Sequence, residues 1–388
     1  MKIAFVFEIF FPTVNGVITS TLNLARNLTE MGHEVLLIAP RWKEYQEPRV
    51  EGLPVRYITS AANWAYPGMR TVLPWNRTVE GVLKREGIDI LHVTGPWLLT
   101  WAAIRGARRL GIPVVHTFHT LLHEPSYIIY FVRLRIFVPL IRALAWSYFG
   151  LYIRRSDVNT GPSRMVCDQL RRHFPESDVR YISNGVDVAR FDTYAPREEL
   201  RARYPLHNDR TFLFVGRLGE EKSVHDLIDA MAIVVGRNRE AQLFIVGDGP
   251  SRDHYAAQIH RLGLTGRVFL LGRIPHGELL ASGLIHHSLA FVTASTTENQ
   301  PMTVIEAISC GVPAIVPDVP GITELVESNG LRFAAHDPAA LAETMLRLAE
   351  DPALRAHCAA ESLAMKNRFD GRNVATAFEA VYREVSRQ

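Results

Sequence analysis

Short, continuous runs of apolar residues recur along this chain and are separated by helical patterns. They lie at residues 3–7, 35–39, 88–93 and 113–118, and again at 211–216, 242–247, 267–272, 289–294 and 314–317. Strands without polar alternation are typical of parallel sheets that helices cover on both faces. The sequence therefore predicts an α/β protein with two doubly wound, Rossmann-like sheets in tandem.

A charged segment separates the two series of strands. Residues 187–210 carry two prolines and no convincing strand, which is typical of a linker. We expect one domain over residues 1–190 and a second over 208–371, with the active site in the cleft between them. Residues 372–388 have apolar side chains at helical spacing, so the chain should end in an amphipathic helix.

Composition excludes several classes of protein. A chain of 388 residues with 47% apolar and 21% charged residues is neither disordered nor collagen-like. The 43 basic and 40 acidic residues nearly balance, which argues against a nucleic-acid partner. Cys167, Cys310 and Cys358 are too far apart for a disulfide framework or a zinc cluster. Because the first residues also lack the pattern of a signal peptide, we expect a cytoplasmic protein.

The strongest local signal is TENQPMTVIEAISCG, residues 297–311. Pro301 suits the first turn of a helix and Gly311 the residue after its end, so a helix is predicted over about 301–310. Glu298 precedes this helix and Glu306 lies within it. A carboxylate ahead of a helix can accept hydrogen bonds from sugar hydroxyls, and the second carboxylate could hold a ribose. The competing interpretation is a capping residue plus a solvated helix face.

The first turn of that helix offers a further binding feature. The backbone amides of Met302 and Thr303 have no acceptor within the helix, so they are free to face a phosphate. In the sequence GRLGEEKS, Arg217 and Lys222 follow a predicted strand and suit a diphosphate, although such cations are often only solvated. Gly16, in the loop FFPTVNG, allows a ligand to approach the backbone, although a single glycine is more often part of a simple turn.

One stretch of the chain has a strong bias in its composition. Residues 125–156 contain no acidic side chain, while basic side chains lie among aromatic and aliphatic ones, namely Arg133, Arg135, Arg142, Arg154 and Arg155. The longest apolar run, 136–153, contains Pro139 and barely reaches the length of a bilayer span, so we reject a transmembrane helix. The stretch predicts either a buried helix pair with snorkelling arginines or a segment that lies on an anionic membrane.

Taken together, these motifs resemble the retaining glycosyltransferases of the GT-B fold, specifically glycosyltransferase family 4. The resemblance covers essentially the whole chain, from the NGV loop through LTEMGHEVLLIAP, VVHTFHT, YISNGVDVARF and LFIVGDGP to SCGVPAIVPDVPG. It implies two Rossmann-like domains that face each other across a cleft. It also implies that the last helix crosses back to the first domain, whereas the simpler alternative keeps this helix on the second.

The resemblance assigns roles to individual residues. It implies that Arg217 and Lys222 neutralise the donor diphosphate beside Gly16, that Glu298 binds the donor hexose, and that Glu306 binds the ribose. His119 matches the histidine beside the transferred sugar. The remaining donor-binding positions that the resemblance implies are Asn299, Gln300, Met302 and Thr303.

The same resemblance implies catalysis with retention of the anomeric configuration and without a divalent metal or other cofactor. No Asp-x-Asp pair occurs in the chain, which agrees with a diphosphate held by cations of the protein. Because the sequence departs from the family pattern at two places, it does not determine which hexose is transferred. Asn15 replaces the first glycine of the usual pair, and Asn299 to Pro301 replace a loop that is often Gly and Phe.

Residues 120–155 resemble the basic, aromatic region of members that glycosylate membrane lipids, such as phosphatidylinositol mannosyltransferases and diacylglycerol glycosyltransferases. We therefore expect a UDP-sugar donor and a lipid or lipid-linked acceptor at an anionic membrane surface, with Arg133, Arg135 and Arg142 in contact with it, and a peripheral location on the inner face of the cell membrane. The alternatives are a soluble small-molecule or polysaccharide acceptor, a GDP-mannose donor and, remotely, a non-catalytic nucleotide-sugar-binding module. A dehydrogenase is disfavoured because no strand is followed by a full G-x-G-x-x-G.

Overall fold

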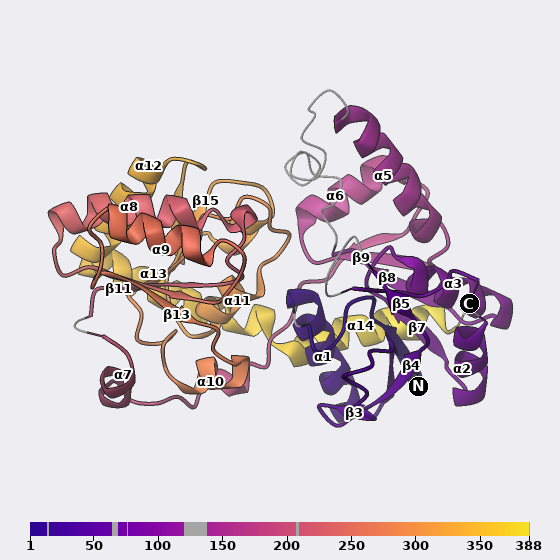
Figure 1. Ribbon diagram of the computed structural model, residues 1–388. Coiled ribbons are helices and arrows are strands. Elements are labelled where there is room, and N and C mark those ends of the chain that lie inside the picture. Colours follow the sequence, from indigo (N-terminus) through magenta and orange to yellow (C-terminus); the bar gives the residue numbers. More distant parts are fainter. Residues whose placement is uncertain (14, 64–68, 76, 120–137, 207–208, 388) are drawn as a thin grey trace. The chain divides into compact units, whose positions relative to one another are not determined.

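The chain forms two compact units, each built on one parallel sheet (Figure 1). The computed structural model describes residues 1–387 except 14, 64–68, 76, 120–137 and 207–208. Unit 1 consists of Met1–Gly185 and Gly371–Gln388, and unit 2 of Val186–Asp370. The predicted α/β class with two doubly wound sheets is confirmed.

An eight-stranded sheet forms the centre of unit 1, in the order β10-β9-β8-β7-β1-β2-β4-β3. All neighbouring strands are parallel except β3 and β4. The strand order reverses between β1 and β7, which is where open parallel sheets bind ligands. The strands are β1 (Lys2–Val6), β2 (Glu34–Pro40), β3 (Arg49–Val50), β4 (Leu53–Ile58), β7 (Ile90–Val93), β8 (Val114–Thr117), β9 (Val158–Gly161) and β10 (Val179–Tyr181), and a separate hairpin is made by β5 (Ala61–Ala62) and β6 (Arg70–Thr71).

Helices cover both faces of this sheet because alternate strand residues point to opposite sides. Ile3 and Phe5 belong to the core beneath α1 and α14, whereas Ala4 and Val6 belong to the core beneath α2 and α3. A smaller apolar cluster joins α5 and α6 to the end of the sheet. The helices of unit 1 are α1 (Gly16–Glu30), α2 (Thr78–Glu86), α3 (Leu98–Leu110), α5 (Val138–Ile153), α6 (Arg164–His173) and α14 (Gly371–Val385).

The last helix, α14, packs beside α1 in unit 1, although it follows unit 2 in the chain (Figure 1). The apolar face predicted for residues 372–388 is buried, with Val374, Phe378, Val381 and Val385 in the same core as β1. His33, at the start of β2, bonds Glu379 of α14 at 3.0 Å. Unit 1 is therefore built from two separate parts of the chain.

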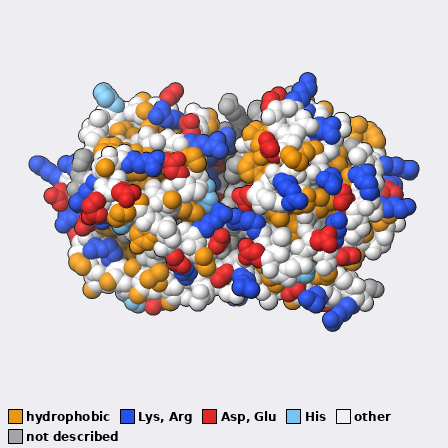
Figure 2. Space-filling model, turned by 90° about the horizontal axis from the view of Figure 1, so that it is seen from below, with side chains coloured by type: hydrophobic (Ala, Val, Ile, Leu, Met, Phe, Trp, Pro, Cys, Tyr) orange, Lys and Arg blue, Asp and Glu red, His pale blue; other side chains and the backbone are white. Residues whose placement is uncertain are grey.

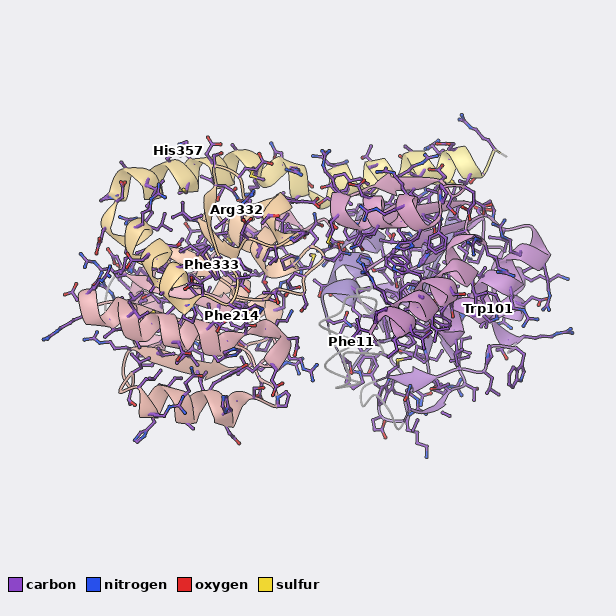
Figure 3. All side chains as sticks on the ribbon, turned by 90° about the horizontal axis from the view of Figure 1, so that it is seen from above. Phe11, Trp101, Phe214, Arg332, Phe333 and His357 are labelled. Atoms are coloured by element: carbon purple, nitrogen blue, oxygen red, sulfur yellow. The ribbon has the colours of Figure 1, made fainter. Side chains whose placement is uncertain are left out.

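A six-stranded parallel sheet forms the centre of unit 2, in the order β13-β12-β11-β14-β15-β16. Here the order reverses between β11 and β14. Leu213 and Phe214, neighbours on β11, point to opposite cores; Phe214 and Phe333, labelled in Figure 3, share the core beneath α8 and α12. The strands are β11 (Thr211–Val215), β12 (Gln242–Val246), β13 (Val268–Gly272), β14 (Ala290–Val292), β15 (Ala314–Pro317) and β16 (Gly330–Phe333).

The helices of unit 2 divide between the two faces of its sheet. Residues of α8, α9 and α12 pack on one face, and residues of α10 and α11 on the other. The helices are α7 (Arg197–Arg203), α8 (Val224–Arg237), α9 (Arg252–Arg261), α10 (His276–Ala281), α11 (Met302–Ser309), α12 (Pro338–Glu350) and α13 (Pro352–Met365), with 3-10 turns η2 (Val188–Phe191), η3 (Glu220–Lys222), η4 (Ile322–Leu325) and η5 (Lys366–Phe369).

The predicted linker is wrong in its extent. Residues 187–210 belong to unit 2, in which they form η2 and α7. Three apolar residues lie among the charged residues of this segment: Phe191, Leu200 and Leu206 are buried in the core beneath α10 and α11. The Ala195 amide also donates a hydrogen bond of 2.8 Å to the Ala281 carbonyl. The boundary between the units falls at Gly185 and Val186 instead of near residue 190.

Candidate active site

Four of the predicted site residues of unit 2 lie on loops and helices that follow β11 and β14. Arg217 lies two residues after the end of β11 and Lys222 ends η3, while Glu298 follows β14 and Glu306 lies in α11. These are the two strands between which the strand order reverses. The topology therefore brings residues that are about 80 positions apart to one edge of the sheet, the carboxyl edge, where such sheets bind ligands.

Lys222 and Glu298 form an ion pair that joins these two loops. Both side chains are largely buried, with 22% and 17% of their surface exposed. Arg217 is exposed. The ion pair fixes Lys222 at the carboxyl edge of the sheet. Arg217 lies on the same loop as Lys222, so two cations could contact a bound diphosphate.

The helix that follows β14 is close to its prediction. A helix over about 301–310 was expected, and α11 spans Met302–Ser309. Pro301 is its N-cap and provides no side-chain cap; its carbonyl accepts a hydrogen bond from the Ile305 amide at 3.3 Å. The amides of Met302 and Thr303 belong to the first turn, which has no acceptors within the helix. This end of the helix is therefore suited to an anion.

The residues just before α11 are buried. Asn299 is 8% exposed and Gln300 is 7% exposed. Both keep hydrogen-bonding side chains near the helix start, so replacing the usual Gly and Phe adds polar groups to this loop.

Glu306 is almost completely buried, and its partner is a residue that the motif did not reveal. Its carboxylate oxygen Oε1 lies 2.9 Å from Nε2 of His276, the first residue of α10. The Glu306 side chain is 4% exposed, whereas that of His276 is 41% exposed. His276 follows β13, so its position after a parallel strand is the one signal in the sequence that could have identified it.

The loop GDGP, residues 247–250, supports the loop that carries Arg217. The Leu218 amide donates to the Asp248 carbonyl at 3.0 Å, and the Ser251 amide donates to the Leu218 carbonyl at 2.9 Å. Gly247 has φ 142°, and a Cβ atom there would lie 1.8 Å from the Gly216 carbonyl oxygen. The glycine is thus required for two backbone loops to touch, which is a different role from that of a dinucleotide-binding fingerprint.

In unit 1, Gly16 is the first residue of α1, and the preceding Asn15 is its N-cap. The Asn15 side chain accepts a hydrogen bond of 3.0 Å from the Ile18 amide. A glycine at position 15 could not make this bond. The replacement of the usual glycine by asparagine therefore stabilises the start of α1.

His119 follows β8 and lines a pocket of about 20 Å³ in unit 1. Its neighbours in this pocket include His92 and Thr94 from β7 and its carboxyl end, and Ser20 and Asn184, whose side chains hydrogen bond at 2.8 Å. Burial, together with a smaller effect of the nearby His116, lowers the pKa of His119 to about 4. At neutral pH the imidazole is therefore uncharged.

A chain of side-chain hydrogen bonds runs through the same pocket. Nδ1 of His92 lies 2.5 Å from the Tyr382 hydroxyl of α14, and Nε2 lies 2.7 Å from the Thr117 hydroxyl. Thr117 in turn lies 2.7 Å from the Thr160 hydroxyl. Desolvation holds the pKa of His92 well below its usual range. The network links the C-terminal helix to the strand that ends beside His119.

His116 does not line this pocket and packs in the sheet instead. Its Nδ1 atom lies 3.3 Å from the Asn159 side-chain oxygen, and its ring meets Phe118 edge-on. Burial lowers the pKa of His116 to about 4. This position agrees with a structural role and separates it from His119.

Glu8 is a buried carboxyl group that sequence reasoning missed. It follows β1, at the reversal of strand order in unit 1, and its Oε1 atom accepts a hydrogen bond of 2.5 Å from the Thr100 amide in the first turn of α3. Trp97, the N-cap of α3, provides no side-chain cap. Burial raises the pKa of Glu8 to about 7, although the bond to Thr100 lowers it. A carboxylate directly after a first strand was the available signal.

Of the three arginines predicted at the membrane, Arg133 and Arg135 lie outside the described residues, and Arg142 is exposed on α5. The helix buries one side, with Trp146 and Phe149 in an apolar cluster. Arg155, at the end of the helix, lies over the ring of Trp101, which Figure 3 labels on α3. Leu140, Leu144 and Leu151 are 58%, 60% and 42% exposed, so α5 presents an unusual number of apolar side chains to solvent.

Within the residues that the structure describes, no helix is long and apolar enough to span a bilayer. Within the same residues, no three side chains of His, Cys, Asp or Glu are grouped to hold a metal ion. Over the face that Figure 2 shows, basic and acidic side chains are interspersed on each unit.

Comparisons with known proteins identify the family. The model of Glycosyltransferase Family 4 matches residues 14–190, and that of Glycosyl transferases group 1 matches residues 196–364. A GDP-mannose-dependent alpha-mannosyltransferase of Mycolicibacterium smegmatis is 32% identical over 331 residues, which cover 84% of this chain and 82% of that protein. An alpha-monoglucosyldiacylglycerol synthase of Streptococcus pneumoniae is 26% identical over 385 residues, which cover 94% of this chain and 82% of that protein.

The fold agrees with these sequence matches. The solved structure of Anabaena HepE in complex with UDP superimposes with a TM-score of 0.79 at 20% identity, covering 99% of this chain and 100% of that chain. This likeness, with two units that are each built on one mainly parallel sheet, shows the GT-B fold of glycosyltransferases. The chain belongs to glycosyltransferase family 4.

Proposed function

We propose that this glycosyltransferase moves a hexose from a nucleoside-diphosphate sugar, with UDP favoured, to a hydroxyl group of a membrane lipid or lipid-linked acceptor, with retention and without a divalent metal. The observation that carries the proposal is the cluster at the carboxyl edge of unit 2. Two cations, two carboxylates and the amino end of α11 come from the segments that follow β11 and β14, and they suit the charge and hydroxyl groups of such a donor.

The donor groups have complementary partners in this cluster. Arg217 and Lys222 supply the positive charge that a diphosphate requires, and the start of α11 adds backbone amides. Glu298 would accept hydrogen bonds from hexose hydroxyls and Glu306 from the ribose. Because both carboxylates are largely buried, their hydrogen bonds to a ligand would form away from bulk water.

The chemistry follows from where charge develops. The bond between the anomeric carbon and the diphosphate oxygen breaks, and negative charge grows on the leaving phosphate. Arg217, Lys222 and the amides of α11 would stabilise that charge. The acceptor hydroxyl attacks from the same face and gives its proton to the leaving phosphate, so no protein nucleophile is needed. His119, neutral at pH 7, would hold the transferred sugar by hydrogen bonding without adding charge.

The proposal of a lipid acceptor is supported by the exposed side chains of α5. Leu140 and Leu144 lie one turn apart on the same side of α5 and are both more than half exposed, and Arg142, which points to another side of the helix, is also exposed. A helix that exposes both apolar and cationic side chains suits the boundary of an anionic bilayer. The relative named as a diacylglycerol glucoside synthase supports a lipid acceptor.

Sedimentation with lipid vesicles tests the proposal that the acceptor is a membrane lipid. Burying the exposed part of each leucine is worth about 1 kcal/mol or more, so the double variant Leu140→Gln, Leu144→Gln should lower partition onto phosphatidylglycerol vesicles by at least about tenfold. Leu363→Gln, at a leucine of unit 2 that is 55% exposed, is the matched control. Equal sedimentation of all three proteins would leave the soluble acceptor as the better hypothesis.

Calorimetry tests the donor half. The wild-type protein should bind UDP or GDP without added metal, and Glu306→Ala should weaken that binding by at least tenfold. The relative named for its dependence on GDP-mannose favours GDP as the second candidate, so both nucleotides are titrated. Unchanged affinity in Glu306→Ala would remove the ribose role of this carboxylate.

A further inference from the structure

The carboxylate of Glu306 is held by a residue outside the family motif. Nε2 of His276 lies 2.9 Å from Oε1 of Glu306. The two residues are 30 positions apart and come from different elements, α10 and α11. An ionised carboxylate only accepts hydrogen bonds, so the histidine nitrogen that faces it carries the proton.

We propose that His276 is a positioning residue that fixes the Glu306 carboxylate for the two ribose hydroxyls and so sets the preference of the site for ribonucleotides over deoxyribonucleotides. The inference rests on the proposed ribose-binding role of Glu306. It concerns specificity, because the bond to His276 restricts which way the carboxylate can turn.

The geometry supports this role. A carboxylate offers about four acceptor positions, and His276 uses one position on Oε1. Because Glu306 is 4% exposed, little water is available to bond the rest or to reorient the group. A fixed carboxylate can accept from two neighbouring hydroxyls at once, whereas a freely rotating one would lose this bidentate geometry.

The backbone around His276 is also fixed by contacts. The carbonyl of Pro275, the residue before it, accepts from the Leu279 amide at 2.9 Å. The Gly272 carbonyl, at the end of β13, accepts from the Gly247 amide at 2.9 Å. The loop that carries His276 is therefore held on both sides, and its side chain reaches Glu306 from a defined position.

Two variants of nearly equal size separate the hydrogen bond from packing. In His276→Gln the side-chain amide keeps an N–H donor at a similar reach, while His276→Met has similar length and no donor. The measured quantity is the ratio of dissociation constants for the 2′-deoxy, and separately the 3′-deoxy, nucleotide and its parent, using whichever of UDP and GDP the wild-type protein binds. Thermal melting and circular dichroism check that each variant is folded.

We expect the wild-type protein and His276→Gln to prefer the ribonucleotide, and this preference to fall by about fivefold to tenfold in His276→Met, as for the loss of one hydrogen bond. An unchanged ratio in His276→Met would overturn the inference. A fall of equal size in His276→Gln would also overturn it, because packing and not the donor would then be responsible.

Glu306→Ala distinguishes a failure of the inference from a failure of the proposed function. If this variant keeps the full preference for ribose, Glu306 does not bind the ribose and the proposed role itself is wrong. If the preference is lost in Glu306→Ala and kept in His276→Met, the ribose role stands and the positioning role of His276 alone is refuted.

Discussion

The buried carboxyl group of Glu8 makes a quantitative prediction about stability. Its pKa is raised from 4.5 to about 7, because burial outweighs the hydrogen bond from the Thr100 amide. Between these values the unfolded chain has an ionised Glu8 while the folded protein keeps the proton. The folded state therefore binds more protons, and its stability falls as the pH rises from 4.5 through 7.

The magnitude follows from the size of this shift. Each pKa unit corresponds to 1.36 kcal/mol, so the shift from 4.5 to about 7 removes about 3 kcal/mol. Glu8→Gln resembles the protonated carboxyl group and does not titrate. The stability of this variant relative to the wild-type protein should therefore increase by about 3 kcal/mol between pH 4.5 and pH 8, and it should stay constant outside that window.

Tryptophan fluorescence during urea unfolding measures this difference. All six tryptophans lie before residue 147, so the signal reports on unit 1 alone. His92, His116 and His119 have lowered pKa values, and their contribution is lost as the pH falls below 6.5. Because both proteins contain these histidines, their effect cancels in the difference. Parallel stability curves for the two proteins would refute the assignment of a proton to Glu8.

Three further predictions concern the donor site and the C-terminal helix. Arg217→Met and Lys222→Met should each lower turnover by about 10²- to 10³-fold, with little change in melting temperature for the exposed Arg217 and a lower melting temperature for Lys222→Met, which leaves the largely buried Glu298 without this cation; a rate equal to that of Lys84→Met, a change at an exposed residue of unit 1, would contradict the diphosphate role. Turnover should be unchanged in excess EDTA, and a loss that magnesium restores would show a metal requirement. Phe378→Ala removes a ring that is 4% exposed and should cost about 3–5 kcal/mol by tryptophan fluorescence, whereas a cost below 1 kcal/mol would mean that α14 contributes little to unit 1.

The sequence was sufficient for the nine strands with continuous apolar runs, and all nine are present. It was insufficient for strands that are short and polar. β9 reads VNTG, with the fully buried Asn159 and Thr160, and such a pattern is typical of a loop. These side chains are tolerated inside the sheet because the residues they bond, His116 and Thr117, lie on the neighbouring strand β8.

Glu298 and Glu306, and the loop that carries Arg217 and Lys222, could be found from the sequence because each follows an apolar strand. Their partners could not be found, since Lys222 pairs with Glu298 across 76 positions and His276 with Glu306 across 30. Spacing along the chain carries no information about contacts that depend on strand order. The predicted linker failed for a related reason, because its three buried apolar residues lie among charged neighbours and follow no clear period.

The pairs Lys222–Glu298 and His276–Glu306 in unit 2 meet the same physical requirement, which is a partner for a buried carboxylate. A glutamate that binds hydroxyl groups must be largely buried to exclude water, yet a buried carboxylate without a partner is costly. Lys222 satisfies this requirement for Glu298 and His276 does so for Glu306. In each pair the partner comes from the loop after another strand of the sheet, β11 in one case and β13 in the other. The loops after β11, β13 and β14 are therefore tied to one another by the same groups that we propose bind the donor. Any substitution of a motif glutamate must consequently be interpreted together with the cation or donor that it leaves unpaired.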